Sequence, residues 1–295
     1  DSWKRRCGAR GMGALAKSAT FSISEPFDPL AVPVRPAATV MLVRDHPLNG
    51  LEVFMLQRTM SAVFAKGMYV FPGGRVDASD DTSELQSVCD DLTDEQASAI
   101  LGVASGGLAF WIAAIRECFE EAGVLLARPE DGRHPIRFDD ELRAERFAHA
   151  RHHVHDASLS LVELCRREKL RLITDTMHYV SHWITPVGEP RRFDTRFFLA
   201  QMPEGQEPLH DDRETINSLW VTPASALERS ARGELVMLPP TTRNLEFLAA
   251  HKTTSEVLEA ARALGTPKAI LPQLRVDAEG KVIGVAMPGD ADYRD

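Results

Sequence analysis

One segment of the sequence combines a long apolar run with a compact group of acids. Residues 108–127, LAFWIAAIRECFEEAGVLLA, contain no proline, and their single glycine, Gly123, is suited to a left-handed helix cap. At about 100° per residue, Glu117, Glu120 and Glu121 share one face, while apolar side chains occupy the opposite arc. The segment is therefore predicted to form a helix that packs its apolar arc on a sheet and points its acids away.

The segments around this helix predict a sheet that is covered by further helices. Apolar runs bounded by turn residues predict strands at 37–43, 51–58, 67–72, 178–186, 191–202 and 216–223. Helical patterns are found at 93–101, 139–170, 224–235, 241–251 and 255–264. Because strands and helices do not alternate regularly, the expected fold class is α/β with a mixed, α+β-like sheet.

The chain is expected to form one main domain. That domain is placed at 34–265, with insertions at about 81–107 and 128–175, and residues 266–295 are expected to pack on it as a C-terminal tail. Residues 1–33 are interpreted as a disordered leader, because the first 17 residues hold five basic side chains against one acid. No apolar segment follows them that would favour a targeting signal.

Composition excludes several classes of function. The longest apolar stretch, residues 108–115, is far shorter than the roughly 20 residues that cross a bilayer, so no membrane association is expected. A net charge of -9 without a basic stripe argues against polymeric nucleic acid as a partner. The four cysteines show no Cys-x-x-Cys spacing, so a cytoplasmic protein is expected rather than one with a zinc knuckle or disulfide framework.

The three acids of the predicted helix suggest a cation. Two like charges 5 Å apart repel by about 3 kcal/mol at an effective dielectric near 20, so a partly enclosed cluster needs positive charge. Mg²⁺ fits best because it takes hard oxygen ligands and bridges to phosphate, whereas zinc would call for His or Cys. An isolated pair of glutamates would more often be a solvated helix face.

The full string around these acids resembles a known family. Residues 116–124, RECFEEAGV, match the core of the Nudix box, Arg-Glu-apolar-x-Glu-Glu-x-Gly-apolar, at every position, and residues 71–74, FPGG, resemble its start. The chain therefore resembles a Nudix hydrolase. The resemblance implies an α/β/α sandwich around a mixed sheet, here with extra helices, and cleavage of nucleoside diphosphates linked to another moiety.

The box departs from the family pattern by an insertion. Arg116 follows Gly74 by 42 residues, whereas the family spacing is 14, so 28 residues are inserted. Asp80 stands where the family usually has Glu. Together with Asp77 and Asp81, it is expected to cap the chain or to be solvated rather than to act in catalysis. The double glycine is expected to let the backbone approach a metal and a phosphate.

An insertion at this place resembles the coenzyme A diphosphatase branch, of peroxisomal type. Arg58, Gly67, Phe71 and Gly74 keep the spacing of the coenzyme A motif of that branch, which makes them candidate substrate-binding residues. Two positions depart from the motif, with Thr59 in place of Ser or Ala and Val63 in place of a second Arg. Other diphosphates therefore remain alternatives: ADP-ribose, NADH, a nucleotide sugar or an oxidised nucleotide.

The resemblance also implies roles for individual residues. Glu117, Glu120 and Glu121 would hold one to three Mg²⁺ ions, for which Mn²⁺ can substitute, and the carbonyl of Gly73 is a further candidate ligand. Arg116 would hold the glutamates by salt bridges. A metal-bound water would attack phosphorus, and coenzyme A would give 3′,5′-ADP and 4′-phosphopantetheine. The general base comes either from the box or from a later loop, where Glu214 is the candidate.

The remaining polar groups have competing interpretations. Arg192, Asp194 and Arg196 share one strand face, with Arg191 beside them, and form either a substrate wall or a surface ladder. The histidines His149, His152, His153 and His155 have the spacing of a chelate but more often form a solvated face. Three tryptophans, Trp111, Trp183 and Trp220, are expected in the core. A homodimer and a catalytically silent sensor domain are further possibilities, although all three helix acids are retained.

Overall fold

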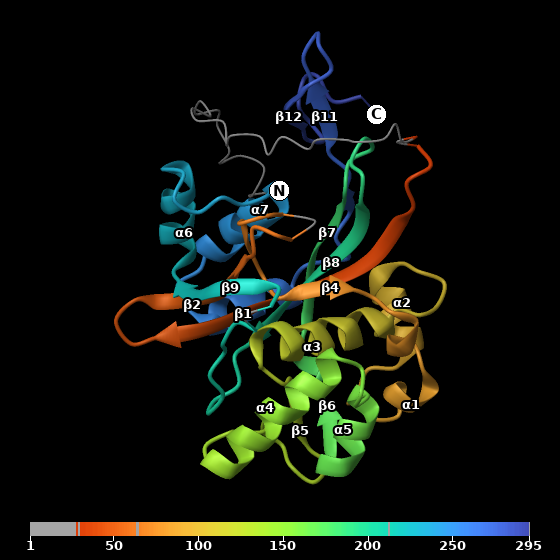
Figure 1. The fold of residues 1–295 in the computed structure, drawn as a ribbon, viewed down its shortest axis with the longest axis vertical. Helices are drawn as coiled ribbons and strands as arrows, with labels where there is room; N and C mark the ends of the chain where they lie inside the picture. Colours follow the sequence, from red (N-terminus) through yellow and green to blue (C-terminus); the bar gives the residue numbers. More distant parts are fainter. Residues whose placement is uncertain (1–27, 29, 63–64, 212, 295) are drawn as a thin grey trace.

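A mixed sheet of eight strands forms the centre of the molecule. The computed structural model describes residues 28, 30–62, 65–211 and 213–294, so most of the predicted leader lies outside the described residues. The main path of the sheet runs β10-β7-β8-β1-β2-β3, with β4 paired to β1 and β9 paired to β2 (Figure 1). Strands β1 and β8 are parallel, as are β7 and β10, and the other pairs are antiparallel.

The strands follow the predicted segments closely. The sheet consists of β1 (Val34–His46), β2 (Gly50–Arg58), β3 (Tyr69–Val70), β4 (Gly73–Arg75), β7 (His178–Ile184), β8 (Arg192–Gln201), β9 (Thr215–Val221) and β10 (Ala269–Ile270). Two small antiparallel pairs lie outside it. They are β5 (Ala127–Pro129) with β6 (Leu170–Leu172), and β11 (Gln273–Val276) with β12 (Val282–Ala286).

Strands β1 and β2 diverge. The segment that contains Gly73 and Gly74, called the glycine segment below, lies between them. They pair with each other only where residues 43–46 face 50–53. Further along, β4 pairs with β1 at residues 37–39, and β3 pairs with β2 at residues 56–57. The backbone of Val40 also donates a hydrogen bond to the carbonyl of Pro72, at 2.9 Å. The segment from β3 to β4 is therefore held between the two long strands.

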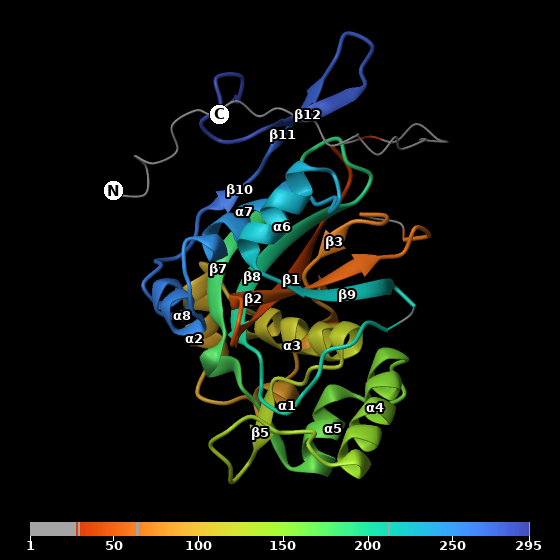
Figure 2. The ribbon, with the colours of Figure 1, turned by 90° about the vertical axis from the view of Figure 1, so that its left-hand side faces the viewer.

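Helices cover both faces of the sheet. One face carries α3 (Leu108–Ala122), with α1 (Ser83–Gln86), α2 (Asp94–Leu101), α4 (Glu141–His155) and α5 (Leu161–Glu168) around it. The other face carries α6 (Pro223–Ala231), α7 (Pro239–Ala249) and α8 (Thr254–Arg262). Figures 1 and 2 show these layers, with α3 between the sheet and the small layer formed by α4, α5, β5 and β6. The predicted α/β class with a mixed sheet is confirmed.

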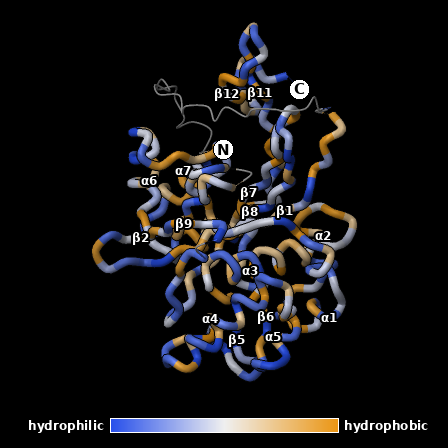
Figure 3. The backbone as a smooth tube through the Cα atoms, in the orientation of Figure 1, coloured by the Kyte–Doolittle hydropathy of each residue, from blue (hydrophilic) through white to orange (hydrophobic). Residues whose placement is uncertain are grey.

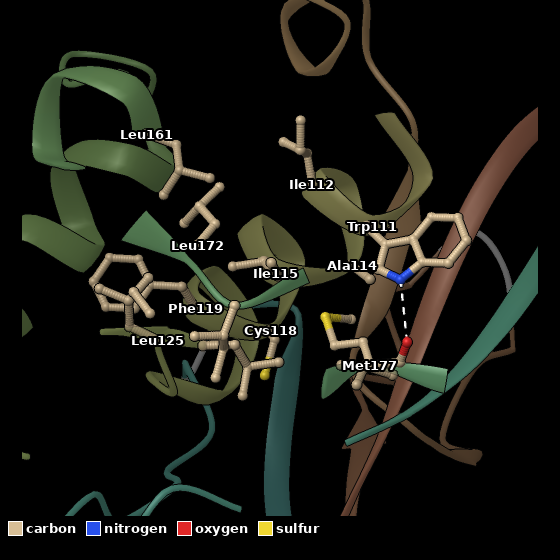
Figure 4. Packing of buried hydrophobic residues seen from close by; sticks show 14 of the residues in the cluster. Trp111, Ile112, Ala114, Ile115, Cys118, Phe119, Leu125, Leu161, Leu172 and Met177 are labelled. Carbon is tan, nitrogen blue, oxygen red and sulfur yellow. Dashed lines mark hydrogen bonds between the residues drawn. The ribbon is translucent and has the colours of Figure 1, made fainter. Parts of the chain in front are cut away.

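Helix α3 is the central element of the larger core. Trp111, Ile115, Cys118 and Phe119 are almost fully buried, and Leu172 from β6 packs beside them (Figure 4). The indole Nε1 of Trp111 donates a hydrogen bond to the carbonyl of Met177, at 3.2 Å. Along α3 the hydropathy changes from hydrophobic at its start to hydrophilic near its end (Figure 3). The buried start fixes the helix in the core, and its polar end carries the three glutamates that are candidates for catalysis.

The first insertion belongs to the core of the domain. Leu85, Cys89, Ala97 and Leu101 from this segment are buried in the cluster around α3. The side chain of Asp94 accepts hydrogen bonds from the backbone of Gly106 and Leu108, both at 3.0 Å. It thereby satisfies donors at the start of α3, where Gly107 has no side chain to do so. The inserted residues thus help to fix the orientation of α3.

Two predicted segments differ in detail from the structure. The helix predicted at 139–170 is two helices, because the chain reverses at Ala157, which has a positive φ of 59°, and Ser160 then caps α5. The residues predicted as a polar tail contain three strands, of which β10 joins the main sheet beside β7. The β11–β12 pair extends from the body in Figure 1. Among the described residues, no helix is both long and apolar enough to span a bilayer.

Candidate active site

The end of α3 is fixed by a helix cap and by an arginine from α4. Gly123 adopts a φ of 71° and donates its backbone hydrogen bond to the carbonyl of Phe119, at 3.0 Å. Arg151 donates from Nε to the carbonyl of Glu120, at 2.9 Å, and from Nη2 to that of Glu121, at 2.8 Å. These contacts satisfy carbonyls at the helix end and hold the two glutamates in place.

The glycine segment lies directly against the acids of α3. A Cβ atom at Gly74 would lie 2.4 Å from Oε1 of Glu117, so a side chain here would push that carboxylate out of its present position. The backbone N–H of Gly73 donates to Oε2 of Glu121, at 2.9 Å. The expectation that the acids point away from the sheet is wrong for Glu121, whose residue is 4% exposed, because β4 passes over this end of the helix.

Arg116 joins the two halves of the box across the inserted segment. Its Nε donates to Oδ1 of Asp80 at 2.8 Å, and its Nη2 donates to Oδ2 at 2.9 Å. Its Nη1 lies 2.9 Å from Oε1 of Glu117 and 3.3 Å from Oε1 of Glu120, and its Nη2 also donates to the carbonyl of Arg75. The 28 inserted residues therefore leave the contact between the halves intact.

Asp80 has the capping role that the sequence suggests, but it is not solvated. Its Oδ2 accepts a hydrogen bond from the backbone of Asp77, at 2.8 Å, and its residue is 1% exposed. Asp80 thus pairs with Arg116 inside the protein. Burial alone would lower the pKa of Arg116, but the hydrogen bonds that it donates to Asp80 and the charges of Glu117 and Glu120 raise that pKa overall.

The three glutamates are short of positive charge. Burial raises the pKa of Glu117 to about 7, and the negative charge of Glu120 adds to this while Arg116 opposes it. Burial also raises the pKa of Glu120, and burial together with the charge of Glu117 raises that of Glu121. The arginines present do not cancel the cost of ionising three enclosed carboxylates. The cluster would be relieved by a further cation.

A second arginine, Arg58, connects the box to the loop that precedes β9. Nη1 of Arg58, at the end of β2, lies 3.6 Å from Oε1 of Glu121, and its Nη2 lies 3.2 Å from Oε2 of Glu214. The side chain of Glu214 is 51% exposed. The structure thus brings together the arginine of the coenzyme A motif, a box acid and the loop glutamate that the sequence singled out.

The loop that carries Glu214 is held by Asp211. Its carboxylate accepts hydrogen bonds from the backbone of Arg213, Glu214 and Thr215, at 3.2, 3.1 and 2.9 Å. Burial raises the pKa of Asp211, but these hydrogen bonds outweigh it and lower the pKa overall. The backbone of Thr59 also donates to the carbonyl of Glu214, at 2.9 Å. Glu214 is therefore fixed beside β2.

The donor set fits a hard divalent cation by its chemistry. Glu117, Glu120 and Glu121 supply carboxylate oxygens, and no sulfur or imidazole lies among them. Within the described part of the chain, no three His, Cys, Asp or Glu side chains are already placed to hold one ion. In this arrangement Arg116 and the N–H of Gly73 donate hydrogen bonds to carboxylate oxygens that would otherwise be available to bind a cation. Gly73 presents its N–H to Glu121 here, whereas the sequence suggested its carbonyl as a ligand.

Two candidate substrate residues lie at different depths. Gly67 has a φ of 65°, and its carbonyl accepts a hydrogen bond from Nε2 of Gln57 at 3.3 Å, in the turn before β3. Phe71 is 3% exposed and belongs to the core on the α6–α8 face of the sheet. Gly67 is thus a turn residue. Phe71 is a core residue that anchors the start of the glycine segment on the α6–α8 face of the sheet. Val63, at the missing arginine position, lies outside the described residues.

The arginines of β8 are predicted to form either a substrate wall or a surface ladder, and the structure shows neither arrangement in full. Arg196 is 4% exposed, pairs with Asp194 and His182, and lies over the ring of Phe110, with Cζ 5.1 Å from its centroid. Arg192 is 9% exposed, and its Nε donates to the carbonyl of Thr185, at 3.1 Å. A surface ladder is therefore wrong for these two arginines, because both are buried. Trp111 and Trp183 are buried as expected, and Trp220 is half-buried.

The histidine-rich helix α4 contributes two residues to the site that sequence reasoning missed, Arg151 and His155. His155 lies with Nδ1 3.8 Å from Oε2 of Glu120. His155 and Arg151 are four residues apart on α4, so both face the end of α3. The spacing of Arg151 and His155 shows that they share one helix face. Nothing in the sequence indicates that this face packs against the end of α3. The other three histidines, His149, His152 and His153, are exposed, as a solvated face requires.

Comparisons with known proteins agree with this geometry. Residues 90–248 match the family model described as the NUDT19 Nudix domain. The chain is 29% identical to human "Acyl-coenzyme A diphosphatase NUDT19", over 88% of this chain and 76% of that protein. It is 29% identical to the chicken protein of the same name, over 88% of this chain and 79% of that protein.

A solved structure has the same fold. The crystal structure of a NUDIX hydrolase from Alicyclobacillus acidocaldarius matches with a TM-score of 0.61 and 25% sequence identity, covering 81% of this chain and 100% of that chain. The sequence signature and the fold therefore identify the same family.

Proposed function

This chain belongs to the Nudix family of hydrolases, and we propose that it cleaves the diphosphate bond of coenzyme A or acyl-coenzyme A in the presence of a divalent cation. The observation that carries this proposal is the box assembled around Arg116, in which Glu117, Glu120 and Glu121 meet the glycine segment despite the insertion. The human and chicken relatives, which are named acyl-coenzyme A diphosphatases, support the choice of substrate.

The acids of α3 are the proposed cation ligands. Glu117, Glu120 and Glu121 would hold Mg²⁺, with Mn²⁺ as a substitute and the Gly73 carbonyl as a further candidate ligand. When bound, the cation neutralises the diphosphate, lowers the pKa of a water and stabilises the leaving oxygen. Arg116 positions Glu117 and Glu120, and the Gly73 N–H and Arg58 position Glu121.

Glu214 is the proposed proton acceptor. The box acids are committed to holding positive charge, whereas Glu214 is half-exposed and is directed by Arg58 toward Glu121. Its carboxylate would take a proton from the attacking water, whose oxygen forms a bond to phosphorus as the bridging P–O bond breaks. With coenzyme A the two products are 3′,5′-ADP and 4′-phosphopantetheine, and an acyl group would stay on the second product.

The glycine segment has a separate part in this proposal. With no side chain at Gly74, the backbone runs close to the Glu117 carboxylate, and a diphosphate held by the acids would approach this backbone. Arg58 offers a guanidinium beside Glu121 that can meet a phosphate oxygen as well as Glu214. A homodimer stays a prediction, as does the cellular compartment.

The test is a product assay by mass spectrometry. The purified chain with Mg²⁺ would be offered coenzyme A, an acyl-coenzyme A, ADP-ribose, NADH, a nucleotide sugar and an oxidised nucleotide. We expect release of 3′,5′-ADP from the coenzyme A species at the highest kcat/KM. Preference for another diphosphate would overturn the substrate, and no turnover of any compound would favour the silent sensor domain.

A further inference from the structure

An arginine-lined cavity lies beside the box. It has a volume of about 410 Å³ and is formed by the chain leading into β1, the end of β4 and the connection between β7 and β8. Four arginines line it, namely Arg35, Arg75, Arg191 and Arg192, and the other lining residues, Val32, Pro33, Pro190 and Phe193, carry no charge. In Figure 1 the start of β1 and the β7–β8 connection lie side by side above β4.

The sheet register brings the backbones of three of these arginines to the same end of the sheet, where Arg35 and Arg192 leave their strands on opposite faces. Parallel pairing of β1 with β8 places Val34 opposite Arg192 and Arg35 opposite Phe193. Antiparallel pairing of β1 with β4 places Arg75 opposite Ala37, two residues further along β1. Three segments that are far apart in the sequence therefore each bring arginine to one place. This convergence depends on regular strand pairing and not on a surface loop alone.

The positive charge of the cavity is poorly balanced by the protein itself. Arg75 pairs with Asp77, at 3.3 Å between Nη2 and Oδ1. In the portion of the chain that the structure describes, Arg35, Arg191 and Arg192 form no ion pair with a carboxylate. Arg192 is 9% exposed and is held by Thr185, so one guanidinium is fixed in the wall. Such an arrangement favours a bound anion, and arginine matches phosphate in a bidentate manner.

The cavity is close to the reaction site but separate from it. Arg75 follows directly on Gly74, and its carbonyl accepts a hydrogen bond from Nη2 of Arg116, at 2.9 Å. A strand rises about 3.3 Å per residue, so Arg75 lies roughly 7 Å from Gly73, which contacts Glu121. An anion in the cavity would therefore lie beyond the diphosphate and belong to another part of the same substrate.

We propose that this cavity binds a phosphate monoester of the substrate, distinct from the diphosphate that is cleaved. This inference rests on the proposed function, because in coenzyme A that group is the 3′-phosphate of the adenosine half. The cavity would then select coenzyme A species over diphosphates that lack a second phosphate. It would also supply positive charge that the coenzyme A motif of this chain lacks at position 63, where Val63 stands in place of an arginine.

The first test compares two substrates that differ only in the 3′-phosphate. Arg35→Ala, Arg191→Ala and the double variant would be assayed with coenzyme A and with 3′-dephospho-coenzyme A. Each single change is expected to lower kcat/KM for coenzyme A about tenfold, and the double change about a hundredfold, with the dephosphorylated substrate little affected. An unchanged ratio between the two substrates in the double variant would overturn the proposal.

A matched control removes an arginine elsewhere. Arg133 is exposed in the bend that follows β5, and β5 lies at the opposite end of the molecule from the start of β1 (Figure 1). Arg133→Ala is expected to keep the wild-type ratio between coenzyme A and its dephosphorylated form. If Arg133→Ala lowered that ratio as much as Arg35→Ala, general charge rather than the cavity would explain the preference.

A binding measurement separates this proposal from the proposed function. Calorimetry without metal would compare 3′,5′-ADP with 5′-AMP, which lacks the second phosphate. The wild-type chain is expected to bind 3′,5′-ADP at least tenfold more tightly, and the double variant to bind both alike. Failure of coenzyme A hydrolysis with this binding difference intact would overturn the reaction and keep the phosphate site. Equal binding of both nucleotides by the wild-type chain would overturn the site, whatever the activity.

Discussion

Two groups of arginines and acids lie on the α3 side of the sheet, and they differ in how their charges are matched. The first group, called the clamp below, consists of Asp90, Arg128, Arg171 and Asp175. The buried carboxylate of Asp90 accepts hydrogen bonds from Arg128 and Arg171, and Arg128 also pairs with Asp175. In the box, Arg116 alone contacts Asp80, Glu117 and Glu120. The clamp has as many arginines as acids, whereas the box has more acids than arginines.

The difference shows what each group is suited to do. The clamp joins the inserted segment to β5 and β6, and its charges are satisfied within the protein. The box leaves three glutamates with raised pKa values because burial is not offset by the arginines nearby. A balanced group stabilises the fold, and an unbalanced one is a place where a ligand supplies the missing charge.

The largest effect is expected from the box acids. Glu120→Gln or Glu121→Gln should lower kcat at least about 10³-fold, or ~4 kcal/mol of transition-state stabilisation, because a neutral amide is a poor cation ligand. Steady-state kinetics with Mg²⁺ measures this, and circular dichroism should show an unchanged fold. Glu145→Gln, an exposed change on α4, is the control. Full activity in either box variant would refute the assignment.

The clamp should show the reverse behaviour. Asp90→Asn should lower the free energy of unfolding by about 3 kcal/mol, because Arg128 and Arg171 lose their shared partner. Urea denaturation measures the loss, while kcat per folded molecule should stay near the wild-type value. Asp139→Asn, which breaks an exposed pair with Arg137, should change stability by less than about 0.5 kcal/mol. Equal losses for the two variants would mean that the clamp has no special role.

Glu214 is the exposed acid of the site, on the loop beside the box, and its change should act on rate alone. Glu214→Gln should lower kcat about 10²-fold, since the amide cannot accept a proton from water. The unfolding free energy should be almost unchanged, because the side chain is 51% exposed. Glu207→Gln, an exposed glutamate in the same connection before β9, is the control. A rate loss that is equal for the two variants would remove Glu214 from the mechanism.

The box should also make stability depend on pH, by a smaller amount. The pKa of Glu117 is raised to about 7 in the folded protein, so folding takes up a proton between about pH 4.5 and 7. Stability from this group is complete below pH 4.5 and is lost as pH rises to 7, by about 3 kcal/mol without metal. Urea melts at pH 5 and pH 8 should show this loss in the wild-type chain and not in Glu117→Gln. Identical pH profiles would contradict the raised pKa.

Local patterns in the sequence predicted the helix, its acids and most of the strands. The spacing of Glu117, Glu120 and Glu121 and the cap at Gly123 depend on neighbouring residues, so periodicity was enough. The roles of Asp80, Arg151 and His155 depend on where segments more than 30 residues apart come to lie. The arginine cavity depends on strand register between β1, β4 and β8. No pattern within a single segment contains that information.

The measurement that tests the central claim most directly is Mn²⁺ binding followed by electron paramagnetic resonance. The wild-type chain and the Asp90→Asn variant would be titrated beside a variant with both Glu120→Gln and Glu121→Gln. The unbalanced box predicts that the first two bind Mn²⁺ alike and that the double variant binds at least about tenfold more weakly. Equal Mn²⁺ affinity in all three proteins would show that the box acids are not the cation site.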